Sequence, residues 1–207
     1  MTLNIHAACP LRPTAPCCQG PYIGSHHGES LILLLTICGS LRAKSSNATL
    51  LDAVALLAGS DIRVERYDRL ADVPLFNPDI DVDPGPPSVA ALRNAIARAD
   101  ALLISSPEYA HGVPGALKNA LDWLVSGVEI LDKPVALVNP SPMSRFAQPQ
   151  LMETLRVMNA RVVDDACVTV PIAGHGPDAT GIVADAELSA VLLRAVEALL
   201  SRVARTG

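Results

Sequence analysis

Residues 31–47 read LILLLTICGSLRAKSSN, and this stretch joins an apolar run to a turn of small, hydroxylated and cationic residues. The continuous apolar run over residues 31–37 is typical of a β-strand that is buried on both faces. Ser45 or Ser46 can then cap a helix that Gly59 ends. The stretch therefore predicts a buried strand, a turn and a helix in direct succession.

The same alternation continues along the chain. Apolar runs predict further strands at residues 61–68, 101–105 and 134–139 and a fifth strand within residues 162–170. Helical patterns predict helices at residues 87–99, 114–126 and 149–160 and from 185 onward. Residues 68–87 read as a long loop rich in proline and aspartate. Strands that alternate with helices five times predict an α/β fold, a three-layer sandwich with helices on both faces of a five-stranded parallel sheet. Periodicity alone does not give the strand order.

Composition narrows the classes of function. The chain has 207 residues, which favours one domain, and 50% of them are hydrophobic while only 3% are aromatic. The formal charge of -5 argues against a nucleic-acid partner. No apolar run reaches the roughly 18 residues that a membrane helix needs, so no membrane partner is expected. Five cysteines without a framework spacing are typical of a reducing cytoplasm, so we expect a cytoplasmic protein.

The first 30 residues differ from the rest of the chain. They contain four prolines, three of the five cysteines and three of the five histidines, and no hydrophobic period runs through them. They lack the charged start and apolar stretch of a signal peptide, and the Cys and His spacing matches no zinc motif. We expect residues 1–30 to be a disordered extension or the product of a start site placed too far upstream. Residues 31–207 then form the folded domain.

The turn after the first strand has the composition of an anion site. It lies at the carboxyl end of a strand, where ligands bind in this class of fold, and at a helix N-terminus, where unpaired N–H groups and the helix dipole attract anions. Ser40, Ser45 and Asn47 supply short hydrogen-bonding side chains, and Arg42 and Lys44 supply positive charge. A terminal phosphate is the expected guest.

Three known loops match this turn in part. A Walker loop requires a second glycine where Lys44 stands, and a dinucleotide fingerprint requires three glycines where the turn has only Gly39. A cysteine phosphatase loop of spacing Cys-x5-Arg-Ser would align with Cys38, Lys44 and Ser45, with lysine in place of the bidentate arginine. A phosphatase that uses Cys38 stays open, and so does an ordinary capped loop with Cys38 as a buried strand-end residue.

Two further loops follow the next two buried strands. The first reads SSPEYAHGVPGALKNALDW (residues 105–123), where two prolines and two glycines stiffen the chain and let its backbone approach a ligand. The second reads NPSPMSRFAQ (residues 139–148). Because the carboxyl ends of parallel strands meet at one edge of a sheet, the three loops should converge on one crevice.

Four segments together resemble the NAD(P)H-dependent FMN reductases, a flavodoxin-like family that includes quinone, azo-dye and chromate reductases. They are GSLRAKSSN (39–47), VPLFNPD (73–79), SPEYAHGVPGALKNALDW (106–123) and KPVALVNPSP (133–142), and the similarity extends from about residue 31 to residue 203. The resemblance implies sheet order 2-1-3-4-5, FMN as cofactor and NADPH or NADH as co-substrate. It also implies ping-pong electron transfer to a small acceptor (a quinone, an azo compound, free flavin or a metal oxyanion) in a homodimer or tetramer.

The resemblance also assigns binding residues position by position. They are Ser40, Arg42, Ser45 and Asn47 at the FMN phosphate, Pro107, Glu108, Tyr109 and His111 near the isoalloxazine ring, and Ser141 in the third loop. No catalytic side chain is implied, because the flavin carries the chemistry. The chain departs from the family pattern at Ala110, where asparagine is usual, and in a third loop that is shorter and bulkier around Arg145.

Individual side chains admit more than one interpretation. Glu108 either hydrogen-bonds within its loop or pairs with an arginine of a second subunit, and Tyr109 packs on the flavin or on that subunit. Trp123 is expected to be a packing anchor, and Lys118 and Asn119 are expected to secure their helix and the dimer.

The acidic part of the long loop does not meet the requirements of a metal site. Asp79, Asp81 and Asp83 alternate as in a calcium loop, but Pro84 and Ala90 stand where that loop requires Gly and Glu. We therefore expect a solvated acidic loop and no bound metal.

Rival functions make different experimental predictions. A one-electron flavodoxin-type carrier usually shields the flavin with aromatic side chains, and this chain has only two Phe, three Tyr and one Trp. A small cysteine phosphatase would hydrolyse p-nitrophenyl phosphate and lose that activity in Cys38→Ser. A dimeric module that kept the fold but lost tight flavin binding would purify without colour.

Overall fold

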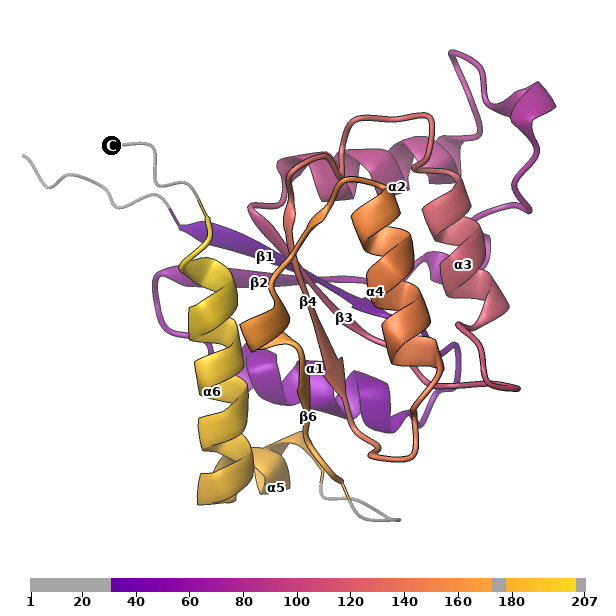
Figure 1. Cartoon of the computed structure of the whole chain (residues 1–207). Coiled ribbons are helices and arrows are strands. Elements are labelled where there is room, and N and C mark those ends of the chain that lie inside the picture. Colours follow the sequence, from indigo (N-terminus) through magenta and orange to yellow (C-terminus); the bar gives the residue numbers. More distant parts are fainter. Residues whose placement is uncertain (1–30, 173–177, 204–207) are drawn as a thin grey trace, which may run out of the picture.

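The computed structural model describes residues 31–172 and 178–203 (Figure 1). The predictions made for residues 1–30 lie outside these ranges. Along the described chain the elements are β1 (Ile32–Cys38), α1 (Ser46–Leu57), β2 (Ile62–Tyr67), η1 (Leu70–Asp72), η2 (Pro78–Ile80), α2 (Pro87–Arg98), β3 (Ala101–Ser105), α3 (Gly115–Asp122), β4 (Pro134–Asn139), α4 (Ala147–Val157), β5 (Arg161–Val162), η3 (Asp164–Ala166), β6 (Val168–Thr169), α5 (Ala179–Ala184) and α6 (Ala186–Leu200).

The strands pair in parallel, in the order β2-β1-β3-β4-β5. β1 lies between β2 and β3, with Leu34 opposite Ala101 and Cys38 opposite Ser105. The predicted flavodoxin-like order is therefore confirmed. Parallel pairing brings the carboxyl ends of β1, β3 and β4 to the same edge of the sheet, where the three predicted loops begin.

Each face of the sheet is covered by its own layer of helices, which confirms the three-layer sandwich (Figure 1). Leu35 and Ile37 of β1 pack in the core that includes α2, α3 and α4. Leu34 of the same strand packs in the other core, with α1, α5 and α6. Successive strand side chains point to opposite faces, so a strand covered on both sides needs a nearly continuous apolar sequence.

The fifth strand differs from its prediction, because the single strand expected at residues 162–170 is divided into two. β5 and β6 each pair in parallel with β4, and the turn η3 separates them. Asp164 and Asp165 begin that turn, and the Asp164 carboxylate forms an ion pair with Arg156 of α4. Aspartate is unfavourable inside strands, so the chain leaves the sheet here and re-enters it at Val168.

Several helix boundaries also differ from the sequence prediction. α4 begins at Ala147, so Pro149 lies in its first turn, where a missing backbone N–H costs no helical hydrogen bond. α3 ends at Asp122 rather than near residue 126. α5 was not predicted, and it begins after Asp178, whose side chain accepts a hydrogen bond from the Gly181 N–H.

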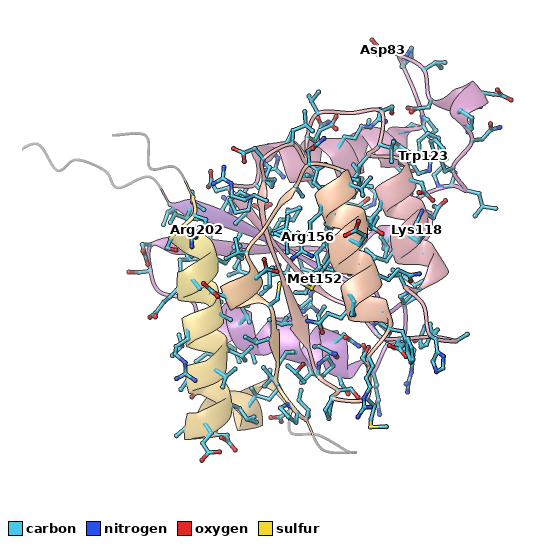
Figure 2. All side chains as sticks on the ribbon, viewed as in Figure 1. Asp83, Lys118, Trp123, Met152, Arg156 and Arg202 are labelled. Carbon is cyan, nitrogen blue, oxygen red and sulfur yellow. The ribbon has the colours of Figure 1, made fainter. Side chains whose placement is uncertain are left out.

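The long loop at residues 68–87 is fastened to α3. The Asn119 side chain donates to the Pro74 carbonyl over 2.8 Å, and the Trp123 indole N–H donates to the same carbonyl over 2.8 Å. Figure 2 shows Trp123 on the side of the molecule where this loop runs, while Asp83 lies far out on the loop. Trp123 is 0% exposed, which confirms the prediction that it is a packing anchor.

Candidate functional site

The first turn is pressed against the second loop at Gly39. The Gly39 N–H donates to the Ser105 carbonyl over 2.8 Å. A Cβ atom at Gly39 would lie 2.6 Å from the Ser106 Oγ and 3.0 Å from the Leu117 side chain. Only glycine leaves room for this approach, so the turn after β1 packs directly against the loop after β3.

Three of the four residues predicted at the phosphate form a buried polar lining of this turn. Ser40, Ser45 and Asn47 are 9%, 7% and 6% exposed, whereas the Arg42 side chain reaches solvent. Ser40 Oγ accepts a hydrogen bond from the Arg42 N–H over 3.3 Å, which shapes the turn. The structure therefore brings these residues together at the start of α1.

The N-terminus of α1 retains unpaired hydrogen-bonding groups. Ser45 occupies the N-cap with extended backbone angles, but its side chain makes no capping hydrogen bond to the helix. The α6 N-cap Asp185, by contrast, accepts hydrogen bonds from the Glu187 and Leu188 N–H groups. Uncapped N–H groups, the helix dipole and the nearby Arg42 together suit an anion such as a phosphate monoester.

Asn47 is oriented by a residue that the sequence prediction did not include. The Ser105 hydroxyl, at the end of β3, donates to the Asn47 Oδ1 over 2.9 Å between two buried side chains. Because the amide oxygen accepts this bond, the Asn47 NH2 group remains as the donor. The sequence signal that was available is a serine at the end of an apolar strand. The structure places this serine next to the turn after β1, because β1 and β3 are paired.

The second loop contains a tight hairpin with two residues at its tip. Tyr109 and Gly112 exchange two backbone hydrogen bonds, over 3.1 and 2.9 Å. The two residues between them, Ala110 and His111, have φ angles of 48° and 60°. Two successive left-handed residues form a turn that favours asparagine and glycine, so Ala110 is held in an unfavourable conformation.

Replacing Ala110 by glycine should stabilise the protein. A non-glycine residue in left-handed geometry costs roughly 1–2 kcal/mol, and relief of that cost should raise the melting temperature by about 2–8 °C. Ala55, an exposed residue within α1, is the matched control, because Ala55→Gly should lower the melting temperature. Thermal unfolding of both variants gives the answer, and a lower melting temperature for Ala110→Gly would contradict the assigned strain.

Glu108 joins the second loop to the third. Its carboxylate accepts hydrogen bonds from the Phe146 N–H over 2.7 Å and the Ala147 N–H over 2.9 Å, with Ser144 Oγ farther away at 3.4 Å. Glu108 therefore caps the N-terminus of α4, so its hydrogen bonds reach the third loop rather than staying within its own loop as one interpretation expected. The pKa of Glu108 is held below its ordinary value, mainly by the hydrogen bond from the Ala147 N–H and next by the one from the Phe146 N–H.

The contribution of Glu108 to stability should depend on pH in acid. A lowered folded-state pKa means that the ionised carboxylate stabilises the fold above the ordinary glutamate pKa of about 4.3, and that this contribution disappears as the pH falls through the lower folded value. Glu108→Gln should therefore melt below the wild type at neutral pH, and the difference should narrow below about pH 4. A difference in melting temperature that stays constant from pH 7 to pH 3 would exclude this role.

An aromatic pair lies beside this junction. The His111 ring stacks on Phe146, with ring centroids 4.2 Å apart and an interplanar angle of 25°. Phe146 is 53% exposed and Tyr109 is 50% exposed, so both present aromatic surface to solvent. The sequence prediction singled out Tyr109 and His111 but not Phe146, whose place beside His111 depends on how the two loops fold together.

Ser141 shapes the third loop rather than projecting from it. Its N–H donates to the Asn139 Oδ1 over 3.0 Å, and its Oγ accepts from the Met143 N–H over 3.2 Å. Pro107 is half-buried at the start of the second loop, next to Glu108. Eight of the nine predicted residues therefore lie on the three loops at the carboxyl edge of the sheet, and the ninth, Asn47, lies in the first turn of α1 at the same edge.

Two further observations concern other predicted sites. Cys38, at the end of β1, is half-buried, and its thiol points to the Ser40 carbonyl at 3.5 Å. Over residues 31–172 and 178–203, no group of three or more Asp, Glu, His or Cys side chains could hold a metal ion.

Comparison with known proteins agrees with this arrangement. A family model described as NADPH-dependent FMN reductase matches residues 32–175. An NAD(P)H-dependent FMN reductase of Pseudomonas aeruginosa is 33% identical over 174 residues, which cover 81% of this chain and 93% of that protein. The quinone reductase of Escherichia coli K12 is 38% identical over 104 residues, which cover 50% of this chain and 54% of that protein.

The solved structures show the same fold. The flavoenzyme FerB of Paracoccus denitrificans, an NAD(P)H:(acceptor) oxidoreductase, superposes with a TM-score of 0.66 at 24% identity, over 83% of this chain and 99% of that one. The matched residues 32–175 contain the turn after β1 and both loops that follow β3 and β4. The chain thus belongs to the NADPH-dependent FMN reductase family, and it is an oxidoreductase.

Proposed function

We propose that this protein binds FMN at the carboxyl edge of its sheet and uses NAD(P)H to reduce a quinone, with ping-pong kinetics. The observation that carries the proposal is the N-terminus of α1, where Ser40, Ser45 and Asn47 line a buried polar turn and the helix retains uncapped N–H groups. This donor set matches the needs of a phosphate monoester. The chain that carries this donor set belongs to the NADPH-dependent FMN reductase family.

The chain's own residues position the cofactor. Ser40, Ser45 and Asn47 donate to the phosphate, and Arg42 adds positive charge from the solvent side. Pro107 and Tyr109 would lie beside the isoalloxazine ring and exclude water from one face, and backbone N–H groups of the second and third loops would favour negative charge on it. When bound, FMN supplies the hydride chemistry between NAD(P)H and the acceptor.

A flat aromatic acceptor suits the exposed side of this edge. Phe146 is backed by His111 on one ring face and is half exposed, and Tyr109 presents a second aromatic surface. Offset stacking on such rings favours planar, conjugated molecules. Stacking of this kind favours a planar acceptor over a metal oxyanion, and the quinone reductases among the relatives favour a quinone over an azo compound or free flavin.

We propose a homodimer in the cytoplasm. Leu75, Val125 and Val128 are 84%, 66% and 72% exposed on the long loop and on the turn after α3, and these apolar side chains would be suited to an interface with a second subunit. Within the described residues, no helix has both the length and the apolar sequence to cross a membrane. Sedimentation velocity measures the assembly directly and distinguishes a dimer from a tetramer.

The visible spectrum of the purified protein is the decisive experiment. A yellow protein, or one that becomes yellow with added FMN, should bleach when NADPH is added anaerobically and regain its colour when benzoquinone follows. A one-electron carrier would stay yellow with NADPH alone, and a protein that never binds FMN would contradict the proposal. Hydrolysis of p-nitrophenyl phosphate, lost in Cys38→Ser, would instead support the phosphatase.

Arg42→Ala should weaken FMN binding. Hydrogen bonds to charged groups contribute about 1.5–3 kcal/mol, so the dissociation constant should rise roughly 10- to 150-fold. Arg63, an exposed arginine of β2, is the control, because Arg63→Ala should leave the affinity unchanged. Fluorescence titration with FMN measures both variants, and unchanged affinity in Arg42→Ala would refute the role of Arg42.

A further inference from the structure

A large cavity among the described residues lies away from the carboxyl edge of the sheet. Its volume is about 590 Å3, and it is lined by the end of α1, the starts of β1 and β2, and α6. Val54 and Leu57 form one wall, and Leu192, Leu193 and Val196 form the opposite one. This volume is within the range of ordinary ligand pockets. We call this cavity the α1–α6 groove.

The α1–α6 groove is apolar, with acidic groups among its lining residues. Leu57, Ile62 and Leu200 are only partly buried, and Leu193 is 39% exposed. Its ionisable lining residues are Asp61 and Glu197, both acidic. An apolar groove of this size favours an occupant that brings apolar side chains of its own.

The chain that precedes β1 enters the structure at this groove. Ile32, the first residue of β1, is one of its lining residues, and Figure 1 shows the start of β1 next to the C-terminal end of α6. Thirty residues come before Leu31, and the family model begins only at residue 32. These residues are therefore an addition to the part of the chain that the family shares.

We propose that the N-terminal segment of residues 21–30 (PYIGSHHGES) docks in the α1–α6 groove, with Tyr22 and Ile23 as its apolar anchors. Tyr22 lies nine positions before Leu31, which allows a reach of about 30 Å. The 15-residue α6 is about 22 Å long, so the segment can follow the whole groove. Within the segment, His26 and His27 can donate hydrogen bonds to Asp61 and Glu197 of the groove. Arg12, which precedes the segment in the sequence, adds a positive charge.

Hydrogen exchange of the full-length protein tests the docking. The double variant Tyr22→Ser/Ile23→Ser should speed amide exchange about tenfold at residues 54–62 and 192–203, because the groove loses its cover. The melting temperature should fall by roughly 3–8 °C, and the affinity for FMN should stay unchanged. The matched control Ile5→Ser/Leu11→Ser removes apolar side chains farther from β1 and should change neither quantity.

A variant of the groove itself completes the test. Leu193→Asn changes a partly exposed lining residue, and its effect on the melting temperature should not add to that of Tyr22→Ser/Ile23→Ser, because both remove the same contact. Additive effects, or unchanged exchange in Tyr22→Ser/Ile23→Ser, would overturn the proposal. A change in sedimentation with Leu193→Asn alone would also overturn it and would make a second copy of the chain the occupant.

Discussion

Ser45→Asp should yield a protein that is folded and at least as stable as the wild type but binds FMN far more weakly. Ser45 is the N-cap of α1, and its hydroxyl makes no capping bond to the helix. Aspartate at this position can accept a hydrogen bond from the first turn and place negative charge at the positive end of the helix dipole. Each of these effects stabilises a helix by up to about 1 kcal/mol.

The same charge should repel the phosphate. Two like charges about 4 Å apart near a protein surface cost roughly 4 kcal/mol, so FMN affinity should fall about 100- to 1000-fold. Riboflavin, which has no phosphate, should bind as weakly to the variant as to the wild type. Ser45→Asn caps the helix without adding charge and should lose far less affinity.

Isothermal titration measures the affinities for FMN and for riboflavin, and thermal unfolding measures the stability. The opposite directions of the stability and affinity changes make the test specific, because a merely unfolded variant would lose both. FMN affinity within about threefold of the wild type would exclude the α1 N-terminus as the phosphate site.

Trp123→Ala should have the largest effect on stability. The side chain is 0% exposed, its indole N–H donates to the Pro74 carbonyl, and Phe76 meets its ring edge-on with centroids 5.1 Å apart. Truncation of a buried tryptophan costs about 3–5 kcal/mol, which should lower the melting temperature by roughly 6–20 °C in a protein of this size. The hydrogen bond that fastens the long loop is lost as well.

Two controls separate packing from hydrogen bonding at this position. Trp123→Phe retains an aromatic ring but loses the N–H donor, so it should cost only about 1–2 kcal/mol. Val125→Ala, two residues later and 66% exposed, should leave the melting temperature nearly unchanged. If Trp123→Ala costs less than about 1 kcal/mol in a denaturant titration, the long loop is not anchored through this side chain.

The sequence predicted the sheet because burial on both faces leaves a clear signal. The runs at β1, β3 and β4 are almost wholly apolar, and each is followed by a turn and a helix. Its order came from family resemblance, because pairing between strands is not a local property. The division of the fifth strand was missed, since the ion pair of Asp164 with Arg156 joins residues whose contact depends on the folded chain.

In the candidate site, too, the residues that are adjacent in the sequence were predictable, whereas the contacts between distant residues were not. The polar turn at Ser40, Ser45 and Asn47 is contiguous in the sequence, so its composition is visible. Ser105 lies 58 residues from Asn47, and its hydrogen bond to that side chain becomes apparent only when β1 and β3 pair. The partnership of His111 with Phe146 likewise required the structure.

The carboxylate of Glu108 has a consequence for anyone who redesigns this enzyme. One side chain on the second loop holds the first backbone N–H groups of α4, so two segments that look independent in the sequence behave as a single mechanical unit. A loop grafted from a relative onto either segment would arrive without its counterpart. Exchanges intended to alter acceptor range should therefore be made in both segments at once.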